Sequence, residues 1–500
     1  MKDRSAYVDP QTLKRGPIVA ILVLGAFVAI LNQTLMNIAL PKMMVDLDIQ
    51  ENSAQWLTTA FMLVNGILIP ITAFFMERFT TRKLFITAMS LFAIGTLICG
   101  VGPEFTTILI GRIVQAAGAG IMMPLLFNTV LSLYPIEKRG SAMGVIGLAM
   151  MFAPAIGPTL SGFIVEHASW RWLFFIILPI AIIDVILAVL VLRNVTKTQK
   201  STVDVLSVIL STVGFGGLLY GFSVAGDKGW GSAPVISTLT VGGIALLIFI
   251  IRQLTIKKPM LEFRVFKYWM FSLSTTINVV ITMAMFAAML LIPIFTQNML
   301  GYSPLKSGLL LLPGALVSAI MSPITGKLFD KIGARPLALI GLLITTITTY
   351  FLSTLSIDTT YTYMMTVYTF RMVGVSMVMM PIMTAGLNQL PKRYYAHGTA
   401  MANTLRQMAG AIGTALLVTV FSTQSKEHVT DLMTTGTPQQ QATLLGSIEG
   451  INDAFWIATI IAAVGFLLSF FLRKVRPADE IEQEQSTATT TPVGKPTETH

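Results

Sequence analysis

Charged residues are scarce in this chain, and cysteine and histidine are scarcer still. Of the 500 residues, 12% are charged and 54% are hydrophobic, with one cysteine and four histidines. Because soluble globular domains carry roughly a quarter charged residues, this composition excludes an ordinary soluble domain and predicts a membrane protein. The one cysteine, Cys99, cannot form a disulfide within the chain, so no disulfide framework is expected.

Several catalytic sequence motifs are also missing. The chain has no Gly-x-x-x-x-Gly-Lys-Ser/Thr phosphate loop, no His-Glu-x-x-His zinc motif and no Gly-x-Ser-x-Gly nucleophile motif. The four histidines are scattered along the sequence. These absences argue against an ATP-driven pump, a metalloenzyme and a hydrolase. We therefore expect no enzymatic activity, no cofactor and no bound metal.

What the chain has instead is a series of long apolar runs. A helix that crosses the hydrocarbon core needs about 20 mostly apolar residues. The sequence contains fourteen such runs, the first near residues 18–38 and the last near 453–472. The first run is long and lacks a small-residue cleavage site, so we expect a retained helix rather than a signal peptide.

The distribution of basic residues orients these spans. Most of the 34 Lys and Arg residues fall in the termini and in the even-numbered loops, and loops rich in Lys and Arg stay in the cytoplasm. We therefore expect a multi-pass plasma-membrane protein with both termini cytoplasmic. The net charge of +10 then reflects topology, and no nucleic-acid partner is expected.

The two ends of the chain repeat one another. A charged turn at residues 326–335 follows a long apolar run, and a rougher copy, residues 73–82, lies about 250 residues earlier. Three shorter echoes share nearly the same spacing: Met-Met-Pro at 122–124 and 379–381, Gly-Ser-Ala-Met at 140–143 with Gly-Thr-Ala-Met at 398–401, and Ala-Ile-Gly at 155–157 and 411–413.

This repeat predicts an all-α polytopic membrane protein with two six-helix bundles and two inserted helices. Parallel six-helix repeats bind substrate near the membrane midplane between the halves and rock around it. We expect the longest non-helical stretch, about residues 424–450, to lie outside the cell. The predicted parts are a cytoplasmic N-terminus (1–17), a first bundle (18–192), a linker with two extra transmembrane helices (193–268), a second bundle (269–473) and a disordered cytoplasmic tail (474–500).

The two charged turns resemble a motif of the major facilitator superfamily, specifically of its fourteen-helix drug/proton antiporters. The second turn matches Gly-x-Leu-x-Asp-Arg-x-Gly-x-Arg with Lys331 at one Arg position, and the first departs from it at Ala73, Glu77 and Thr80. A carboxylate in such a turn can cap or pair across helix ends, while basic residues hold the cytoplasmic interface. The resemblance, which covers roughly residues 14–475, implies a cytoplasmic gating role for Glu77, Arg78, Arg82, Gly326, Asp330 and Arg335.

Residues 153–162, Ala-Pro-Ala-Ile-Gly-Pro-Thr-Leu-Ser-Gly, resemble the antiporter signature of the same family. Small residues let helix backbones approach one another, and proline permits a bend. By this resemblance the helix lies at the seam between the halves and acts as a pivot and a seal; ordinary small-residue packing is the alternative. The signature residues are Pro154, Gly157, Pro158 and Gly162.

Two charged residues within the predicted spans are candidates for proton coupling. Arg112 matches the family's Arg-x-x-Gln-Gly pattern except at Ala116, and a charge at that depth should face the bundle interior or water. The first helix lacks the carboxylate common in the family, because Asn32 stands there. Asp184 is then the clearest mid-membrane carboxylate. We predict that Asp184 carries the proton and that Arg112 tunes it, with a structural role for either as the alternative.

The substrate cavity is expected to be mostly apolar. Methionine is abundant, with 29 residues, and its flexible side chain adapts to varied ligands, although it is also ordinary filler in membrane helices. Neutral polar side chains would add contacts if they face inward. The predicted cavity residues are Asn32, Gln33, Asn37, Gln115 and Met379.

The resemblance therefore implies secondary active efflux of amphipathic small molecules, such as antibiotics, by drug/proton antiport. Residues 32–34 and 77–82 look like those of bacterial exporters of the lincomycin-resistance type. The expected partners are a drug-like molecule, protons and the lipid bilayer, and the expected protein is a monomer in a bacterial membrane. Two alternatives stay open: a flippase for lipids or lipid precursors with the same fold, and a membrane scaffold or sensor that transports nothing.

Overall fold

Long helices make up almost all of the structure, a computed structural model that describes residues 13–196, 198 and 204–473. Fourteen helices in this part of the chain are long and apolar enough to cross a membrane, as predicted. The predicted tail (474–500) and most of the predicted N-terminus lie outside the described residues. The helices are α1 (Arg15–Asp46), α2 (Glu51–Arg78), α3 (Thr81–Val101), α4 (Phe105–Leu133), α5 (Arg139–His167), α6 (Trp172–Val191), α7 (Val205–Lys228), α8 (Ala233–Thr255), α9 (Trp269–Ile294), α10 (Pro304–Ile332), α11 (Ala334–Phe351), α12 (Tyr361–Gln389), α13 (Tyr395–Thr434) and α14 (Gln439–Ser469).

Local sequence explains where several of these helices begin. In hydrocarbon every backbone group must be satisfied inside the protein, and helices do this along their length but not in their first turn. Thr80, Ser303 and Thr360 each accept a hydrogen bond from the backbone N–H three residues later, and so cap α3, α10 and α12. Such caps stabilise a helix by about 1 kcal/mol each.

The same helix pairs pack together in both ends of the chain. Within the first six helices α1 packs on α5 and α6, and α2 and α3 pack on α4. In the last six, α9 packs on α13 and α14, and α10 and α11 pack on α12. Short turns of 3₁₀ helix, Ile136–Lys138 and Lys392–Tyr394, precede α5 and α13 alike. The packing thus follows the predicted duplication, and α1–α6 and α9–α14 are called the first and second halves below.

The most extensive contacts between the halves are made by two helix pairs, α5 with α10 and α2 with α13. We call these contacts the seam. On the α5–α10 side the backbones approach so closely that a Cβ on Gly326 would overlap the carbonyl oxygen of Gly140, and a Cβ on Gly144 would lie 2.7 Å from the carbonyl oxygen of Ser322. Glycine is therefore required at these crossing points.

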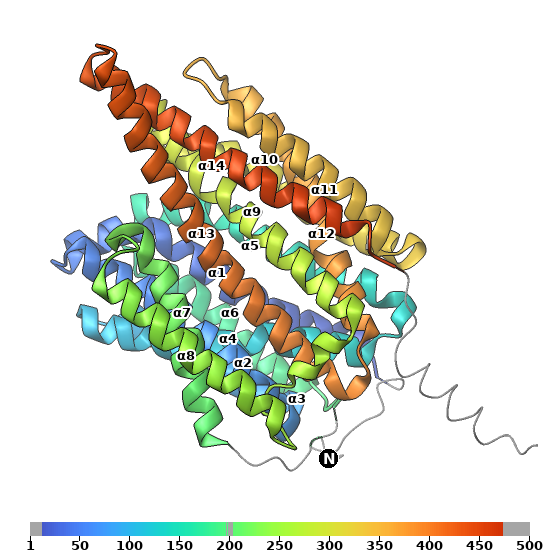
Figure 1. Ribbon diagram of the computed structural model, residues 1–500. Helices are drawn as coiled ribbons and strands as arrows, with labels where there is room; N and C mark the ends of the chain where they lie inside the picture. The colour runs from blue at the N-terminus through green and yellow to red at the C-terminus, as the bar shows by residue number, and fades with distance from the viewer. Residues whose placement is uncertain (1–12, 197, 199–203, 474–500) are drawn as a thin grey trace, which may run out of the picture.

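The seam contacts gather toward one end of the molecule. This end carries the turns after α2, α4, α10 and α12, where many of the basic residues lie, and we call it the basic face. In Figure 1 the two halves meet near the turns after α4 and α10 and diverge toward the turns between α1 and α2 and between α13 and α14. The halves are thus closed together at the basic face.

The structure corrects one sequence expectation at the opposite end. Residues 424–450, expected to be non-helical, are mostly helical, because α13 continues to Thr434 and α14 begins at Gln439. Close backbone packing explains why this polar stretch is ordered. A Cβ on Gly446 would lie 2.7 Å from the backbone nitrogen of Val429, and one on Gly450 would lie equally close to that of Ser425. Figure 1 shows the resulting hairpin projecting beyond its neighbours.

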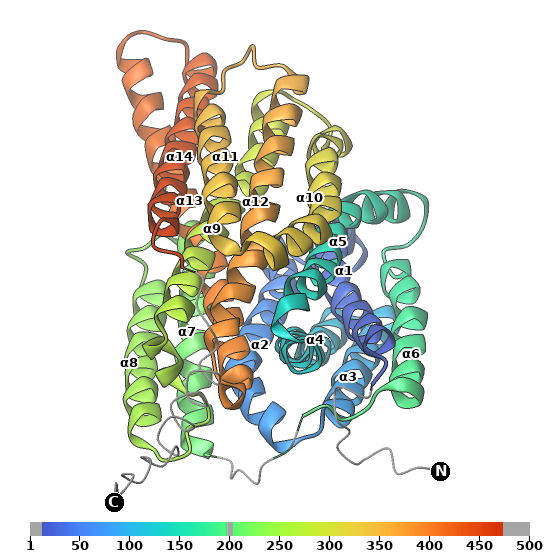
Figure 2. The same cartoon turned by 90° about the vertical axis from the view of Figure 1, so that its right-hand side faces the viewer.

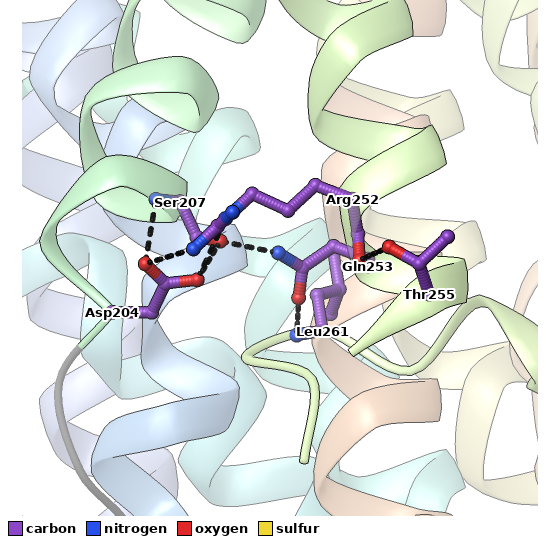
Figure 3. Close-up of polar contacts among 6 residues, drawn as sticks. All are labelled: Asp204, Ser207, Arg252, Gln253, Thr255 and Leu261. Carbon is purple, nitrogen blue, oxygen red and sulfur yellow. Dashed lines mark hydrogen bonds and ion pairs between the residues drawn. The ribbon is translucent and has the colours of Figure 1, made fainter. Parts of the chain in front are cut away.

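The inserted helices α7 and α8 lie beside the seam rather than apart from it. α7 packs on α8 and also on α2 and α13, one helix from each half, and both inserted helices run along one edge of the molecule in Figure 2. At the basic face Arg252 donates to both carboxylate oxygens of Asp204, at 3.0 and 3.1 Å (Figure 3). Gln253 donates to Ser207 at 2.6 Å and accepts from the backbone of Leu261 at 3.2 Å.

This cluster ties α7, α8 and the following loop into one unit. Asp204 also caps α7 by accepting from the backbone N–H of Ser207. The hydrogen bonds from Arg252 hold the pKa of Asp204 below its ordinary value. The contribution of this pair to stability is therefore present at neutral pH and is lost only as the pH falls through that lowered pKa.

The predicted orientation can be tested with two single cysteines in a Cys99→Ala background. We expect Thr435→Cys, in the turn after α13, to react with a membrane-impermeant maleimide on intact cells. Ile332→Cys, 47% exposed at the basic face, should react only after the membrane is permeabilised. The parent Cys99→Ala protein, which should not react, is the control. The opposite labelling pattern would contradict cytoplasmic termini.

Candidate functional site

Asp330, at the end of α10, caps the first turn of α5 from the other half. Its Oδ1 accepts from the backbone N–H of Gly140 at 2.7 Å, and its Oδ2 accepts from the backbone N–H of Ser141 at 2.8 Å and from the Ser141 hydroxyl. The residue at the usual capping position, Lys138, provides no side-chain cap. An anionic carboxylate is favoured at a helix N-terminus, where unpaired N–H groups and the helix dipole meet. Asp330 therefore fastens the two halves together.

Glycine makes this contact geometrically feasible. A Cβ on Gly140 would lie 2.5 Å from Oδ1 of Asp330 and equally close to the carbonyl oxygen of Gly326. The predicted gating residues Gly326 and Asp330 thus act together, one by allowing close approach and the other by bonding. In the sequence Gly140 and Ser141 stand only in an echo of residues 398–401, which gives no sign of their contact with Asp330.

The two copies of this echo, residues 140–143 and 398–401, do not occupy equivalent positions in their helices. Gly140 is the second residue of α5, whereas Gly398 is the fourth residue of α13. A Cβ on Gly398 would meet Leu390 and Leu387 of its own half. Gly398 therefore does not receive a carboxylate from the first half, although the local sequences look alike.

Glu77, the counterpart of Asp330 at the end of α2, bonds to a histidine. Its Oε1 lies 3.0 Å from Nε2 of His397, in the first turn of α13. Nδ1 of His397 accepts from the backbone N–H of Glu262 at 3.3 Å, so Nε2 carries the hydrogen and donates to Glu77. His397 was one of four scattered histidines in the sequence, and nothing in its spacing indicated this role.

Arg139 supplies a third link between the halves. Its Nη1 donates to Oδ1 of Asn388 at 2.9 Å, and its Nη2 donates to the hydroxyl of Tyr395 at 3.0 Å, both in the second half. The same guanidinium donates to the carbonyl oxygens of Tyr134 and Leu131 at the end of α4. We call the contacts of Asp330, Glu77 and Arg139 the latch.

Two of the predicted gating arginines, Arg82 and Arg335, make no hydrogen bond across the seam among the described residues, and their gating role stays a prediction. Arg82 donates from Nη2 to the carbonyl oxygen of Val189 at 2.7 Å, and its backbone N–H bonds to Asn194. It therefore joins α3 to the end of α6 within one half, where a basic side chain satisfies a terminal carbonyl. Arg335 is exposed in the first turn of α11. Arg78 is the last residue of α2, beside Glu77.

Arg112 is fully buried inside the first half. Its Nη1 donates to Oδ1 of Asn32 and to Oε1 of Gln115, both at 2.7 Å, and its Nε donates to the carbonyl oxygen of Leu57 at 3.1 Å. The guanidinium also lies 4.2 Å from the ring centroid of Phe61. This network joins α4 to α1 and α2 through neutral acceptors, as expected for a charge that faces the bundle interior.

The predicted cavity residues are distributed unevenly. Asn32 and Gln115, 2% and 0% exposed, both accept hydrogen bonds from Arg112 in this conformation, and their place in a substrate cavity stays a prediction. Met379 is buried in the apolar core of the second half, and Gln33 is half-buried on α1. The side chain of Asn37 lies outside the described residues.

Asp184 is also fully buried, and neither carboxylate oxygen has a hydrogen-bond partner among the described residues. It faces α1 and α3: a Cβ on Gly25 would lie 3.0 Å from Oδ2 of Asp184 and 2.8 Å from the ring of Phe85. On α3, the Arg112 network reaches Thr96 through Gln115. Phe85 and Thr96 are separated by about 16 Å along a helix that rises about 1.5 Å per residue. The structure therefore does not bring Arg112 and Asp184 together.

The comparisons with known proteins agree with this architecture. The model of the Major Facilitator Superfamily matches residues 22–414. The chain belongs to the major facilitator superfamily. Among solved structures, the proton:xylose symporter XylE has the same fold, with a TM-score of 0.64 and 15% identity over 94% of this chain and 98% of that one.

Closer relatives in this superfamily are bacterial. An uncharacterized MFS-type transporter of Bacillus subtilis, YcnB, is 52% identical over 95% of this chain and 98% of its own length. The lincomycin resistance protein LmrB of the same organism is 43% identical over 93% of this chain and 97% of its own. The multidrug export protein EmrB of Escherichia coli is 28% identical over 90% of each chain. This chain is thus similar to multidrug transporters along almost its whole length.

The residues that resemble the antiporter signature of the superfamily pack within the first half. A Cβ on Gly157 would overlap the hydroxyl of Thr34 on α1, and Ser161 donates to the carbonyl oxygen of Leu35 at 2.7 Å. Gly413 of α13 likewise packs on Met283 of α9. Nothing lies near a Cβ on Gly162, and Pro154 and Pro158 are half-buried. The close backbone contacts of α5 with the second half lie earlier in the helix, around Gly140 and Gly144.

Replacing Asp330 should loosen the basic face of this transporter. Asp330→Asn keeps one acceptor but loses the charge and the second acceptor, so we expect the latched state to be destabilised by about 1–2 kcal/mol, or roughly five- to thirtyfold in population. Spin labels on the ends of α4 and α10 would report this as longer distances.

Asp358→Asn is the matched control, because Asp358 is exposed between α11 and α12. If the Asp330 variant keeps the distance distribution of the parent protein, the capping contact does not hold the halves together.

Proposed function

We propose that the protein exports amphipathic small molecules, such as antibiotics, in exchange for protons. The similarity to lincomycin resistance and multidrug export proteins supports the substrate class. The observation that carries the mechanism is the latch, which holds the two halves together at the basic face. With the basic face in the cytoplasm of a bacterium, this conformation is the outward-facing state of an alternating-access cycle.

In this mechanism the latch must open for substrate to enter from the cytoplasm. Its links are hydrogen bonds at the surface of the membrane, each worth a few kcal/mol at most. Substrate binding can therefore shift the equilibrium from the closed to the open latch. The buried glycines of the α5–α10 seam let the halves stay in contact while they rock.

Asp184 is the group that we propose to carry the proton. An ionised carboxylate in hydrocarbon carries an uncompensated desolvation cost, and both oxygens of Asp184 lack a donor among the described residues. A change in the packing of α6 against α1 and α3 would expose it to water in one phase of the cycle. Arg112, which does not contact Asp184, holds α1 and α2 against α4 in this proposal and acts as a positioning residue.

The relatives give no support to lipid translocation or to a scaffold without transport, the two alternatives that the sequence left open. The deciding experiment is reconstitution into proteoliposomes with an imposed pH gradient. Lincosamides, cationic and anionic dyes and labelled lipids would be tested for movement coupled to protons. If only lipids move, or if none of the tested compounds moves, drug/proton antiport is refuted.

Asp184→Asn should abolish efflux driven by a pH gradient, because the amide cannot exchange a proton. The amide is as neutral as a protonated carboxylate, so folding and substrate exchange without a gradient should persist. The measurement is uptake into inverted vesicles at a fixed pH difference, with Asp358→Asn as control. Unchanged gradient-driven uptake would remove Asp184 from the mechanism.

Gly157→Leu should block transport, because even a Cβ at that position overlaps Thr34. Overpacking of this kind costs about 1–3 kcal/mol and would force α5 away from α1. Gly162→Leu is a matched control from the same signature, since its Cβ meets nothing. Equal transport rates in the two variants, at equal protein amounts in the membrane, would refute a role for the α1–α5 contact.

A further inference from the structure

A pocket lies between α9, α12 and α13 of the second half. Its wall contains four polar side chains, and apolar residues and one glycine form the remainder. Three of the apolar residues, Phe271, Met383 and Leu387, also belong to the apolar cluster that fills the first half, so the pocket lies at the boundary between the halves. The lining residues are Phe271, Ser274, Thr275, Asn278, Met383, Gly386, Leu387, Ala402 and Arg406.

Arg406 is the charged member of this wall. Its Nη2 donates to Oδ1 of Asn403 at 3.2 Å, one turn earlier on the same helix. Asn403 is itself fixed, because it donates to the carbonyl oxygen of Thr399 at 2.8 Å. No carboxylate pairs with Arg406 in the part of the chain that the structure describes.

The other two arginines within the membrane spans are arranged differently. Arg112 donates to three acceptors inside the first half. Arg371 donates to the hydroxyl of Thr349 at 3.1 Å and to the carbonyl oxygen of Ala284 at 2.6 Å. Both are fully buried, and neither lines this pocket. Arg406 differs from them because it lines this pocket.

Ser274 is a second polar group in the pocket that indicates a binding site. It is 1% exposed and lines the pocket, and its hydroxyl oxygen has no hydrogen-bond partner among the described residues. A buried hydroxyl without a partner is destabilising, because it has lost its hydrogen bonds to water and gained none in return. Arg406 and Ser274 therefore leave donors unused in one small apolar pocket.

We infer that this pocket is a subsite for a carboxylate of the transported molecule. A carboxylate would neutralise the guanidinium of Arg406 through charge-assisted hydrogen bonds and would accept from the hydroxyl of Ser274. In this closed conformation the pocket has a volume of only about 10 Å³, room for a water-sized group, so the apolar wall would hold the adjacent part of an amphipathic molecule once the halves separate. The preferred substrates are then amphipathic monocarboxylates rather than cations. This inference rests on the proposed export function and narrows its substrate class.

The position of the pocket suits a molecule bound between the halves. Arg406 lies about 16 Å along α13 from its first residue at the basic face, at a rise of about 1.5 Å per residue. Phe271, at the other edge of the pocket, is the third residue of α9. The subsite therefore extends from the membrane interior toward the latch.

The test uses two dyes that share a xanthene ring, fluorescein with its carboxylate and rhodamine 123, a cationic ester. In proteoliposomes with a pH gradient we expect Arg406→Gln to raise the KM for fluorescein roughly tenfold or more and to leave rhodamine 123 unchanged. Arg406→Lys should recover part of the loss, and Ser274→Ala should raise the KM for fluorescein by a smaller factor. Lys426→Gln, which removes a positive charge from an exposed position of the same helix, is the control.

Direct binding separates this inference from the proposed function. Fluorescence anisotropy of each dye with the purified full-length protein needs no proton gradient and no turnover. Tighter binding of fluorescein that is lost in Arg406→Gln would support the subsite even if no gradient drives export. Equal binding of fluorescein to the parent and to Arg406→Gln would overturn the subsite. So would parallel loss of both dyes together with a lower melting temperature, because Arg406 would then be structural.

Discussion

The closed arrangement of this transporter depends on a carboxylate in one half that caps a helix of the other half. Asp330 lies at the end of α10 in the second half, and the helix that it caps, α5, belongs to the first half. A cap of this kind contributes about 1–2 kcal/mol, which is enough to bias an equilibrium and too little to lock it. The backbone N–H groups at the start of α5 can return to water when the halves separate, because they lie at the end of the bundle. A stronger or more deeply buried bond would oppose the cycle.

The two sides of the seam are not equivalent, although the chain is duplicated. On the α5–α10 side, glycines bring backbones into contact and the carboxylate reaches N–H groups directly. On the α2–α13 side, Ala73 stands where the second turn has Gly326, and Glu77 reaches a histidine side chain. A glutamate that bonds to a histidine side chain spans a wider gap between helices than an aspartate that bonds directly to backbone N–H groups. The α5–α10 side is therefore the tighter contact, and α7 covers the looser one.

Sequence patterns predicted the fold well because the bilayer leaves few choices. Fourteen runs of spanning length became fourteen helices, and the repeat appears in matched helix pairs. Asp330 and Gly326 were identified through their motif. His397 and Arg139 were missed, because each acts through a partner more than 200 residues away and neither stands in a motif that names that partner. The contact of Arg82 with the end of α6 could not be predicted, because a basic turn residue can bond across a seam or to a neighbouring helix end, and only packing decides between them.

The placement of the buried charges constrains how coupling can work. Asp184 lies within the first half, between α6, α1 and α3, whereas the pocket at Arg406 is built by α9, α12 and α13 of the second. A proton on Asp184 and a ligand in the pocket at Arg406 therefore cannot compete for the same atoms. Coupling between them must then pass through the relative motion of the halves, since each site is packed on helices that also form the seam or touch it. The contact of Gly157 with Thr34 belongs to this chain of packing, because α1 contacts both α5 and the helix that carries Asp184. Rigid packing inside each half thus converts a local change at either site into opening or closing of the latch.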